Sequence, residues 1–379
     1  MLDSPRILIF TDWYVPGFKA GGPIRSIANL VALLGPQAWV ITGDRDLGDE
    51  SPYADLSLNQ WVKQDNGSNV MYCSSDAEGS KMIASVCKEF IQDTWYLNSM
   101  FSTRFTLSPM MLNIRLRAKN RVILAPRGML HPEALKIKSW KKKLFLKAMR
   151  ITGFFQRVNW HATGEEEERM IHCHFGESAM VKVVPNVPTF HPFRELIPDL
   201  GILQFIMISR LSEEKGVLEG LTSWFKIQEL KSVHLKIIGP KGNPTYANEV
   251  LALMSNHPDW KVEYLGALSP NDCLYHLNQS HFLFSPTRGE NYGHAIAEAL
   301  FMGVPVLITD TTPWKNLEEK GWGWEYDSKK ENFQEVMLKL LSMTSADYNR
   351  QVDHLRANRS IEQARWKNGL LQSFLFEKH

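Results

Sequence analysis

Two glutamates with seven residues between them lie in the stretch SPTRGENYGHAIAEALFMGVPVLITD, Ser285 to Asp310. Glu290 is in a turn with proline and glycine that follows an apolar run, and Glu298 comes eight residues later, a little over two helical turns. We expect a helix to start near Gly293, which places both carboxylates on a similar face, where they reach different parts of one ligand. Free N–H groups and the partial positive charge at a helix start suit a diphosphate. In the alternative, Glu290 only caps the helix and Glu298 is an exposed or interhelical polar residue.

Two basic side chains accompany another turn, in the segment ISRLSEEKG, Ile208 to Gly216. Arg210 ends an apolar run, and Lys215 lies in the turn that follows. A guanidinium with its planar fork and an ammonium as a point charge are both suited to a diphosphate. The alternative is a solvated turn in which Lys215 pairs locally with Glu213 and Glu214.

These turns belong to a chain in which short β-branched runs alternate with segments of helical period, such as 24–34 and 80–91. The pattern predicts an α/β fold with parallel sheets covered by helices on both faces. We expect strands at 6–10, 39–42, 69–72, 94–97, 121–125, 160–163 and 181–184 in the first half, and at 203–208, 234–238, 261–265, 281–284 and 305–309 in the second.

The length of 379 residues is about right for two domains. The stretch Val183 to Gly201 carries four prolines and no sustained helical period, which is typical of a linker. We therefore predict an N-terminal domain over 1–190 and a C-terminal domain over 191–355. A final helix over 356–379 is expected to pack back on the first domain.

The paired glutamates and the following EALFMGVPVL resemble the motif of retaining GT-B glycosyltransferases of family 4, the glycosyl transferases of group 1. ISRLSEEKG resembles the basic element of that family. IIGPKG, which contains Gly239, resembles its next strand-to-loop turn, and GGPIRSIANLVALLG, with Gly21 and Gly22, resembles its glycine-rich N-terminal loop and first helix.

The resemblance implies a GT-B fold, in which two Rossmann-like domains face each other across a cleft. The second domain would hold the nucleotide-sugar donor and the first the acceptor. Glu290 would contact the donor sugar near the reacting carbon, Glu298 would hold the ribose hydroxyls, and Arg210 and Lys215 would stabilise the departing diphosphate. The other donor-binding residues that the resemblance implies are Gly21, Gly22, Gly239, Asn291, Tyr292, Gly293 and His294.

Two features depart from the commonest pattern of the family. Asn291-Tyr292-Gly293-His294 replaces an apolar residue, Gly and Leu after the first glutamate, so His294 is expected to alter donor choice. Many members place a histidine in the first domain where this chain has APRGMLHP, 125–132. Arg127 takes that place and His131 is the nearby alternative, while an ordinary strand-end turn is the non-functional interpretation.

The segment ALKIKSWKKKLFLKAMR, 134–150, has six lysines and one arginine among apolar residues. Such a basic amphipathic helix suits an anionic membrane surface and a lipid-linked acceptor. A helix that packs on the core with a solvated basic face is the equal alternative. Nucleic acid is not expected as a partner, because no recognised binding motif accompanies the basic run and 43 Lys and Arg nearly balance 41 Asp and Glu.

We expect neither a metal nor a cofactor beyond the nucleotide-sugar substrate. The strings His172-Cys173-His174 and Asp44-Arg45-Asp46 lack a second set of ligands or lie away from the expected donor crevice. The four cysteines are scattered, no apolar run approaches the roughly 20 residues that span a bilayer, and the first residues do not form a signal peptide. The expected location is the cytoplasm, with peripheral contact at the inner face of the membrane as an option.

The expected activity is a retaining, metal-independent transfer of a sugar from a nucleotide-diphosphate sugar to a hydroxyl of a glycan or lipid-linked acceptor, in bacterial surface polysaccharide or lipopolysaccharide synthesis. A catalytically silent nucleotide-sugar-binding scaffold is the alternative from another class. A nucleotide-sugar epimerase or a phosphorylase on the same fold is the alternative within enzymes.

Overall fold

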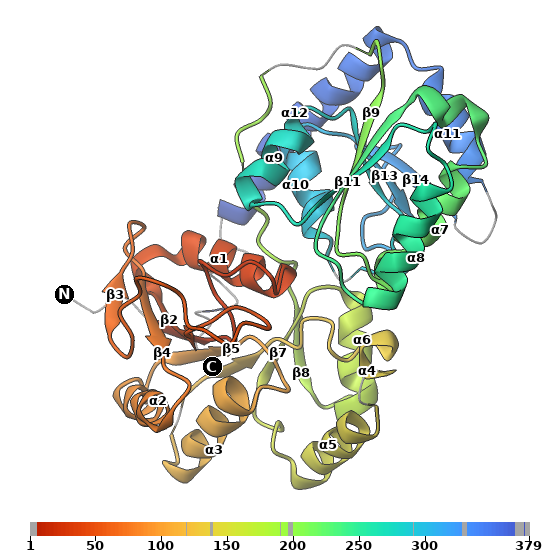
Figure 1. Cartoon of the computed structure of the whole chain (residues 1–379). Helices are drawn as coiled ribbons and strands as arrows, with labels where there is room; N and C mark the ends of the chain where they lie inside the picture. Colours follow the sequence, from red (N-terminus) through yellow and green to blue (C-terminus); the bar gives the residue numbers. More distant parts are fainter. Residues whose placement is uncertain are drawn as a thin grey trace. The chain divides into compact units, whose positions relative to one another are not determined.

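The computed structural model describes residues 6–118, 120–136, 139–189, 191–195, 200–290, 292–327, 332–367 and 375. The chain forms two compact units that divide between Val187 and Pro188, within the predicted linker (Figure 1). The second unit runs through α12, Ser345–Lys367, so the predicted division at 355/356 falls inside a continuous helix. Apart from Leu375, the end of the predicted final helix lies outside the described residues.

The first unit is built on an eight-stranded sheet with the order β3-β4-β2-β1-β5-β6-β7-β8. Only the edge strand β3 is antiparallel to its neighbour. The strands are β1 (Ile7–Phe10), β2 (Ala38–Gly43), β3 (Trp61–Lys63), β4 (Asn69–Cys73), β5 (Thr94–Leu97), β6 (Val122–Leu124), β7 (Asn159–Ala162) and β8 (Met180–Val183). The helices are α1 (Gly22–Leu34), α2 (Ala77–Glu89), α3 (Ser108–Arg115), α4 (Pro132–Lys136), α5 (Ser139–Thr152) and α6 (Glu165–Phe175).

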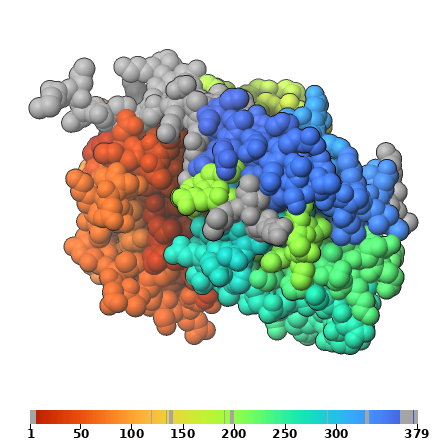
Figure 2. Space-filling model, turned by 90° about the horizontal axis from the view of Figure 1, so that it is seen from above, coloured from red at the N-terminus to blue at the C-terminus, as the bar shows by residue number. Residues whose placement is uncertain are grey.

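The second unit contains a six-stranded sheet, all parallel, with the order β11-β10-β9-β12-β13-β14. Its strands are β9 (Gln204–Ile208), β10 (His234–Ile238), β11 (Val262–Gly266), β12 (Phe282–Ser285), β13 (Val306–Thr309) and β14 (Gly323–Tyr326). Its helices are α7 (Val217–Trp224), α8 (Pro244–Ser255), α9 (Pro270–Asn278), α10 (His294–Met302), α11 (Phe333–Leu341) and α12. Side chains of α12, in blue, lie on the surface of this unit (Figure 2).

Both faces of the second sheet are buried, because successive strand residues enter two different cores. On β9, Phe205 packs with Trp224 and other side chains on one face, whereas Ile206 packs with Leu300 and its neighbours on the other. Such two-sided burial requires near-continuous apolar strands, which is the pattern that the sequence shows. The predicted α/β class with two parallel sheets is therefore confirmed.

All twelve predicted strands are present, with ends shifted by at most one residue. Two strands were not predicted. β3 is a three-residue edge strand, and β14 is Gly-Trp-Glu-Tyr, which begins with glycine and has no β-branched residue. Among the described residues, no helix is long and apolar enough to cross a bilayer.

Candidate donor site in the second unit

The strand order of the second sheet defines where a ligand is expected. Numbered along the chain within this unit, the order is 3-2-1-4-5-6, so the direction of winding reverses between β9 and β12. Ligands of such sheets bind outside the carboxyl ends of the strands at this reversal. Arg210 and Lys215 follow β9, and Glu290 follows β12, so these three sequence-predicted residues come from the two strands that flank the reversal.

The loops that follow β9 and β12 are joined by hydrogen bonds to the Glu214 carbonyl and by a close backbone approach at Gly216. The hydroxyl of Thr287 donates to the carbonyl of Glu214 (3.0 Å), and the backbone N–H of Arg288 donates to the same carbonyl (2.9 Å). Gly216 has φ +61°, and a Cβ there would lie 2.1 Å from the carbonyl oxygen of Pro286. Only glycine allows both the left-handed backbone and this close approach.

This fastening brings Lys215 and Glu290 together across 75 residues of sequence. The Lys215 ammonium donates to the Glu290 carboxylate with an Nζ to Oε2 distance of 2.6 Å, and the two side chains are 25% and 19% exposed. The distance is typical of a charge-assisted hydrogen bond. The alternative interpretation of the basic turn is therefore wrong in one respect, since the ion pair of Lys215 is made with Glu290 and not with Glu213 or Glu214.

The helix after Glu290 begins where the sequence predicts, at His294, with Gly293 as its N-cap. Because Glu290 precedes the helix, the helical spacing from which we expected Glu290 and Glu298 on a similar face applies to Glu298 alone. Gly293 instead has φ +79°, and a Cβ there would lie 3.1 Å from Cγ of Glu290. The N-cap residue Gly293 has no side chain with which to cap the first N–H groups of α10, and Glu298 is buried (4% exposed) rather than a surface residue.

An aromatic cluster holds the turn between Glu290 and α10. The ring of Tyr292 lies 5.0 Å from that of His294 and 5.7 Å from that of Trp314, measured between centroids. The indole N–H of Trp314 donates to the carbonyl of Tyr292. Tyr292 is nearly fully buried and His294 is partly exposed, so His294 is the more accessible of the two predicted residues. The predicted residue Asn291 lies outside the described part of the chain.

Arg210 and Gly239 lie on a second pair of fastened loops. The backbone N–H of Leu211 donates to the carbonyl of Pro240 (3.0 Å), and that of Gly242 donates to the carbonyl of Leu211 (3.1 Å). A Cβ at Gly239 would lie 1.9 Å from the carbonyl oxygen of Ser209, so glycine is required there. Arg210 is exposed, and no described residue forms a hydrogen bond or ion pair with its guanidinium.

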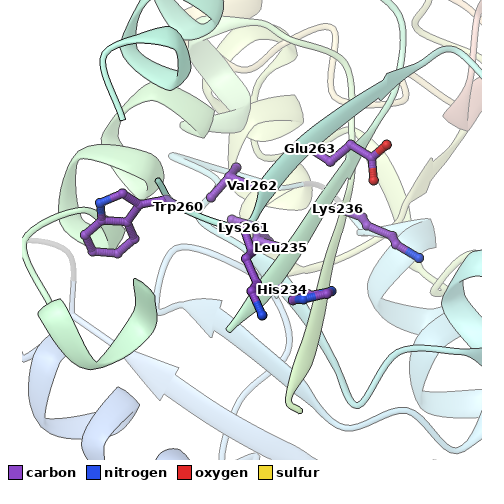
Figure 3. Close-up of a pocket in the computed structure, with 7 residues that line it drawn as sticks. All are labelled: His234, Leu235, Lys236, Trp260, Lys261, Val262 and Glu263. Carbon is purple, nitrogen blue, oxygen red and sulfur yellow. The ribbon is translucent and has the colours of Figure 1, made fainter. Parts of the chain in front are cut away.

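A pocket elsewhere in this unit does not belong to the site. It lies at the starts of β10 and β11, the ends of the strands opposite to Gly239 (Figure 3). Its lining residues are His234, Leu235, Lys236, Trp260, Lys261, Val262 and Glu263. Ligands of such sheets bind at the carboxyl ends of the strands, and this pocket lies at the opposite ends. We therefore do not assign the donor to it.

In the first unit, Gly21 and Gly22 lie at the start of α1. Gly21 has φ +67°, and a Cβ there would meet no atom within 4 Å, so its peptide borders open space. The preceding loop is held by Asp46, whose Oδ2 accepts from the backbone N–H groups of Phe18 (2.6 Å) and Lys19 (2.9 Å). Asp46 of the Asp44-Arg45-Asp46 string therefore stabilises this loop. Within the described ranges, no three or more His, Cys, Asp or Glu side chains gather as metal ligands do.

Arg127 and His131 follow β6 in different surroundings. Arg127, with φ +55°, donates to Asn98, Asn186 and the Tyr96 hydroxyl, whereas His131 is partly exposed and lies 3.8 Å from a Glu166 oxygen. The residues that surround Arg127 were not predicted as site residues. A polar residue soon after a strand is the signal that identifies two of them, since Asn98 directly follows β5 and Asn186 lies three residues after the end of β8. Tyr96 and His161 lie within strands and give no such signal.

The buried position of Glu167 was also not predicted from the sequence. The sequence indicates only that the glutamates of 165–168 add negative charge to the first turn of α6. In the structure Glu167 is buried and accepts from the backbone N–H groups of Gly128 (2.6 Å) and Thr163 (2.8 Å). It therefore fixes the loop that carries Arg127.

Comparison with known proteins supports the assignment of the fold. HepE of Anabaena, solved in complex with UDP and glucose, is 14% identical, with 98% of this chain and 99% of that chain covered and a TM-score of 0.71. Sucrose-phosphate synthase of Thermosynechococcus elongatus is 11% identical, with 98% and 100% covered and a TM-score of 0.67. The α,α-trehalose 6-phosphate synthase of Burkholderia multivorans is 11% identical, with 96% and 97% covered and a TM-score of 0.63. Among curated proteins, none matches this sequence.

The match in sequence falls on the unit that contains the Lys215–Glu290 pair. Residues 194–356 match the family Glycosyl transferases group 1, and this range spans the strands from β9 to β14. The structural matches extend over both units. The chain therefore has the GT-B fold, and its residues 194–356 match the glycosyl transferases group 1 family.

Proposed function

We propose that this protein is a retaining glycosyltransferase that moves a sugar from a nucleotide-diphosphate sugar, without a metal, to a hydroxyl of a glycan or lipid-linked acceptor. The observation that carries the proposal is the Lys215–Glu290 pair at the winding reversal of the second sheet, together with Arg210, which is exposed and follows the same strand, β9, as Lys215. This arrangement combines two cations for a diphosphate with a carboxylate for sugar hydroxyls.

The proposed reaction breaks the bond between the anomeric carbon of the donor sugar and the diphosphate oxygen. The acceptor oxygen forms the new bond to that carbon, and the acceptor proton leaves with the diphosphate. Arg210 and Lys215 neutralise the charge that develops on the departing group, which is the principal electrostatic requirement of the step. Arg127 cannot take the acceptor proton, because an arginine side chain stays protonated in proteins.

UDP is the proposed nucleotide. HepE was solved with UDP-glucose bound, and it shares the fold of this chain over nearly its whole length. We further place the acceptor in bacterial surface polysaccharide or lipopolysaccharide synthesis, at the cytoplasmic face of the membrane. The support for that placement is the surface of α5, described below.

The first test is a thermal-shift panel of UDP, GDP, ADP, dTDP and CMP in the presence of a chelator. We expect UDP at about 100 times its dissociation constant to stabilise the protein by about 2.7 kcal/mol. The stabilisation should be lost in Arg210→Ala and in Lys215→Ala, because each removes a cation from the diphosphate. Lys236→Ala is the matched control, since Lys236 lies at the opposite end of the strands.

The outcomes separate the alternatives. Stabilisation that occurs only with Mg²⁺ would contradict the proposal that donor binding is metal-independent. If no nucleotide stabilises the protein, the assignment of the donor site is refuted. A silent scaffold would bind UDP but release none from UDP-glucose in the presence of acceptors. An epimerase would convert the donor alone, without an acceptor.

The outer face of α5 supports contact with a membrane. Trp140, Leu144 and Ile151, spaced by four and seven residues on one helical face, are 67%, 61% and 74% exposed. The opposite face packs on the core through residues such as Leu146. Exposed basic residues flank the apolar face, namely Lys141, Lys143, Lys147 and Arg150. The two sequence interpretations of this segment are therefore compatible, because the helix packs on the core and still exposes an apolar face with basic borders.

We expect the chain to sediment with vesicles that contain phosphatidylglycerol and not with vesicles of phosphatidylcholine alone. Each Lys or Arg near an anionic surface contributes about 1 kcal/mol to the free energy of membrane binding, and the apolar side chains add to it by inserting between the lipids. The variant Trp140→Ser, Leu144→Ser, Ile151→Ser should lose most of the bound fraction. Ile361→Ser, which changes an equally exposed residue on α12, should retain it. Equal binding by both variants would refute the role of α5.

A further inference from the structure

A fixed guanidinium lies at the carboxyl edge of the first sheet. Arg127 donates through Nε to Oδ1 of Asn98 (2.8 Å), through Nη1 to Oδ1 of Asn186, and through Nη2 to the hydroxyl of Tyr96 (2.7 Å). Its three partners are buried and belong to β5 or follow β5 and β8. All three nitrogens of the guanidinium are therefore held, which fixes its plane as well as its position.

The partners form a hydrogen-bond chain with one direction. The Tyr96 hydroxyl accepts from Arg127 and therefore donates to Nδ1 of His161 (2.6 Å), and Nε2 of His161 donates to the carbonyl of Val184 (2.7 Å). Burial, with a smaller contribution from the charge of Arg127, lowers the pKa of His161 to about 3. The imidazole is thus neutral at physiological pH, in the tautomer that the chain requires.

The hydrogen-bond partners of Arg127 do not neutralise its positive charge. Asn98, Asn186 and Tyr96 are neutral acceptors, and no carboxylate within the described ranges forms an ion pair with Arg127. The carboxylate of Glu167 binds the backbone N–H groups of Gly128 and Thr163 and the hydroxyl of Thr163 instead. A guanidinium has five N–H groups, and three are used here, so two remain for a ligand. Arg127 is itself only partly buried, which leaves it accessible.

The position of this group matches a ligand site. Numbered along the chain and without the antiparallel edge strand, the first sheet has the order 3-2-1-4-5-6-7, with its winding reversal between β1 and β5. Asn98 follows β5, and its amide donates to Thr11, which follows β1 (3.3 Å). Arg127 also adopts a left-handed backbone (φ +55°), an unusual conformation for a non-glycine residue that often occurs at ligand-binding sites.

We propose that Arg127 binds an anionic oxygen group, a phosphate or a carboxylate, in a site of the first unit that is separate from the donor diphosphate site. Arg127 is then a specificity-determining residue that selects an acceptor carrying negative charge, and Tyr96, Asn98 and Asn186 are positioning residues. The assignment of the anion to the acceptor rests on the proposed function, whereas the binding of the anion does not.

The test uses the full chain labelled with ¹⁵N-arginine. The Nε–H resonance of Arg127 is assigned as the signal that Arg127→Lys removes. The protein is titrated with inorganic phosphate at constant ionic strength, with saturating UDP present to occupy the second unit. Glucose 6-phosphate and glucuronate are titrated in parallel to distinguish phosphate from carboxylate. Arg45, whose guanidinium is already paired with Asp44 (2.9 Å), is the internal control.

We expect a saturable shift of the Arg127 signal with at least one of the three anions and no shift of the Arg45 signal. In Tyr96→Phe the charge remains but one hydrogen bond that orients the guanidinium is lost, so the affinity should fall about tenfold. Shifts that stay linear in concentration, or that are equal for Arg127 and Arg45, would overturn the proposal. Failure of UDP to stabilise the protein in the thermal-shift panel would instead refute the proposed donor site, so the two failures are distinguishable.

Discussion

Glu290→Gln is expected to lower the rate of sugar transfer by about 100- to 1000-fold, the effect typical of removing one group that stabilises the transition state. The amide keeps the shape of the side chain but carries no negative charge. It therefore loses the charge-assisted contact with Lys215 and cannot balance positive charge near the reacting carbon. Because the competing carboxylate is removed from Lys215, the affinity for UDP should be retained or increased. The measurement is UDP release from UDP-glucose, with UDP affinity determined alongside.

Glu263→Gln is the matched control, because Glu263 is an exposed carboxylate of the same unit that lines the pocket at the starts of the strands. It should leave both quantities unchanged. If Lys215 and Glu290 act as a unit, the double variant Lys215→Met, Glu290→Gln should be no slower than the slower single variant. Full activity of Glu290→Gln would exclude a catalytic role for this carboxylate.

Gly216→Ala is expected to lower the free energy of unfolding of the second unit by about 2–4 kcal/mol, in the upper range of single substitutions. The left-handed backbone alone costs an alanine about 1–2 kcal/mol. In addition, the new Cβ would lie 2.1 Å from the Pro286 carbonyl oxygen, which is backbone and cannot rotate away. Relief requires the loops after β9 and β12 to separate, so the Lys215–Glu290 contact should also weaken.

Urea unfolding followed by tryptophan fluorescence measures this change, with UDP affinity as a second readout. Gly201→Ala is the control, since a Cβ at Gly201 meets no atom within 4 Å. Equal unfolding midpoints for the two variants would show that the close approach at Gly216 does not constrain the loops.

Most strands, the helix start near Gly293 and the positions of Lys215 and Glu290 in loops after strands could be predicted, because each leaves a local signal. Apolar runs mark the strands of a parallel sheet, and Lys215 and Glu290 lie in the loops that follow two of them. What sequence could not provide is the pairing between distant loops. The contact of Lys215 with Glu290 depends on Gly216, Thr287 and the order of the strands, and none of these is local to either partner.

Buried polar partners were missed for a different reason. Tyr96 and His161 lie within β5 and β7, where an aromatic or polar residue in an otherwise apolar run resembles ordinary core filling. Their role becomes visible only when neighbouring strands place them side by side with Arg127. Similarly, the buried position of Glu167 cannot be read from four consecutive glutamates at a helix start, because any of the four could face inward.

Each unit has its own sheet, its own buried core and its own set of polar loops at the winding reversal. For the evolution of such a chain, this separation means that a change in the loops after β9 and β12 leaves the packing under Arg127 untouched, and the reverse is also true. Under the proposed function, preference for a donor and preference for an acceptor can therefore diverge independently. A chimera that joins the second unit to the first unit of a relative would be a natural starting point for new combinations of the two.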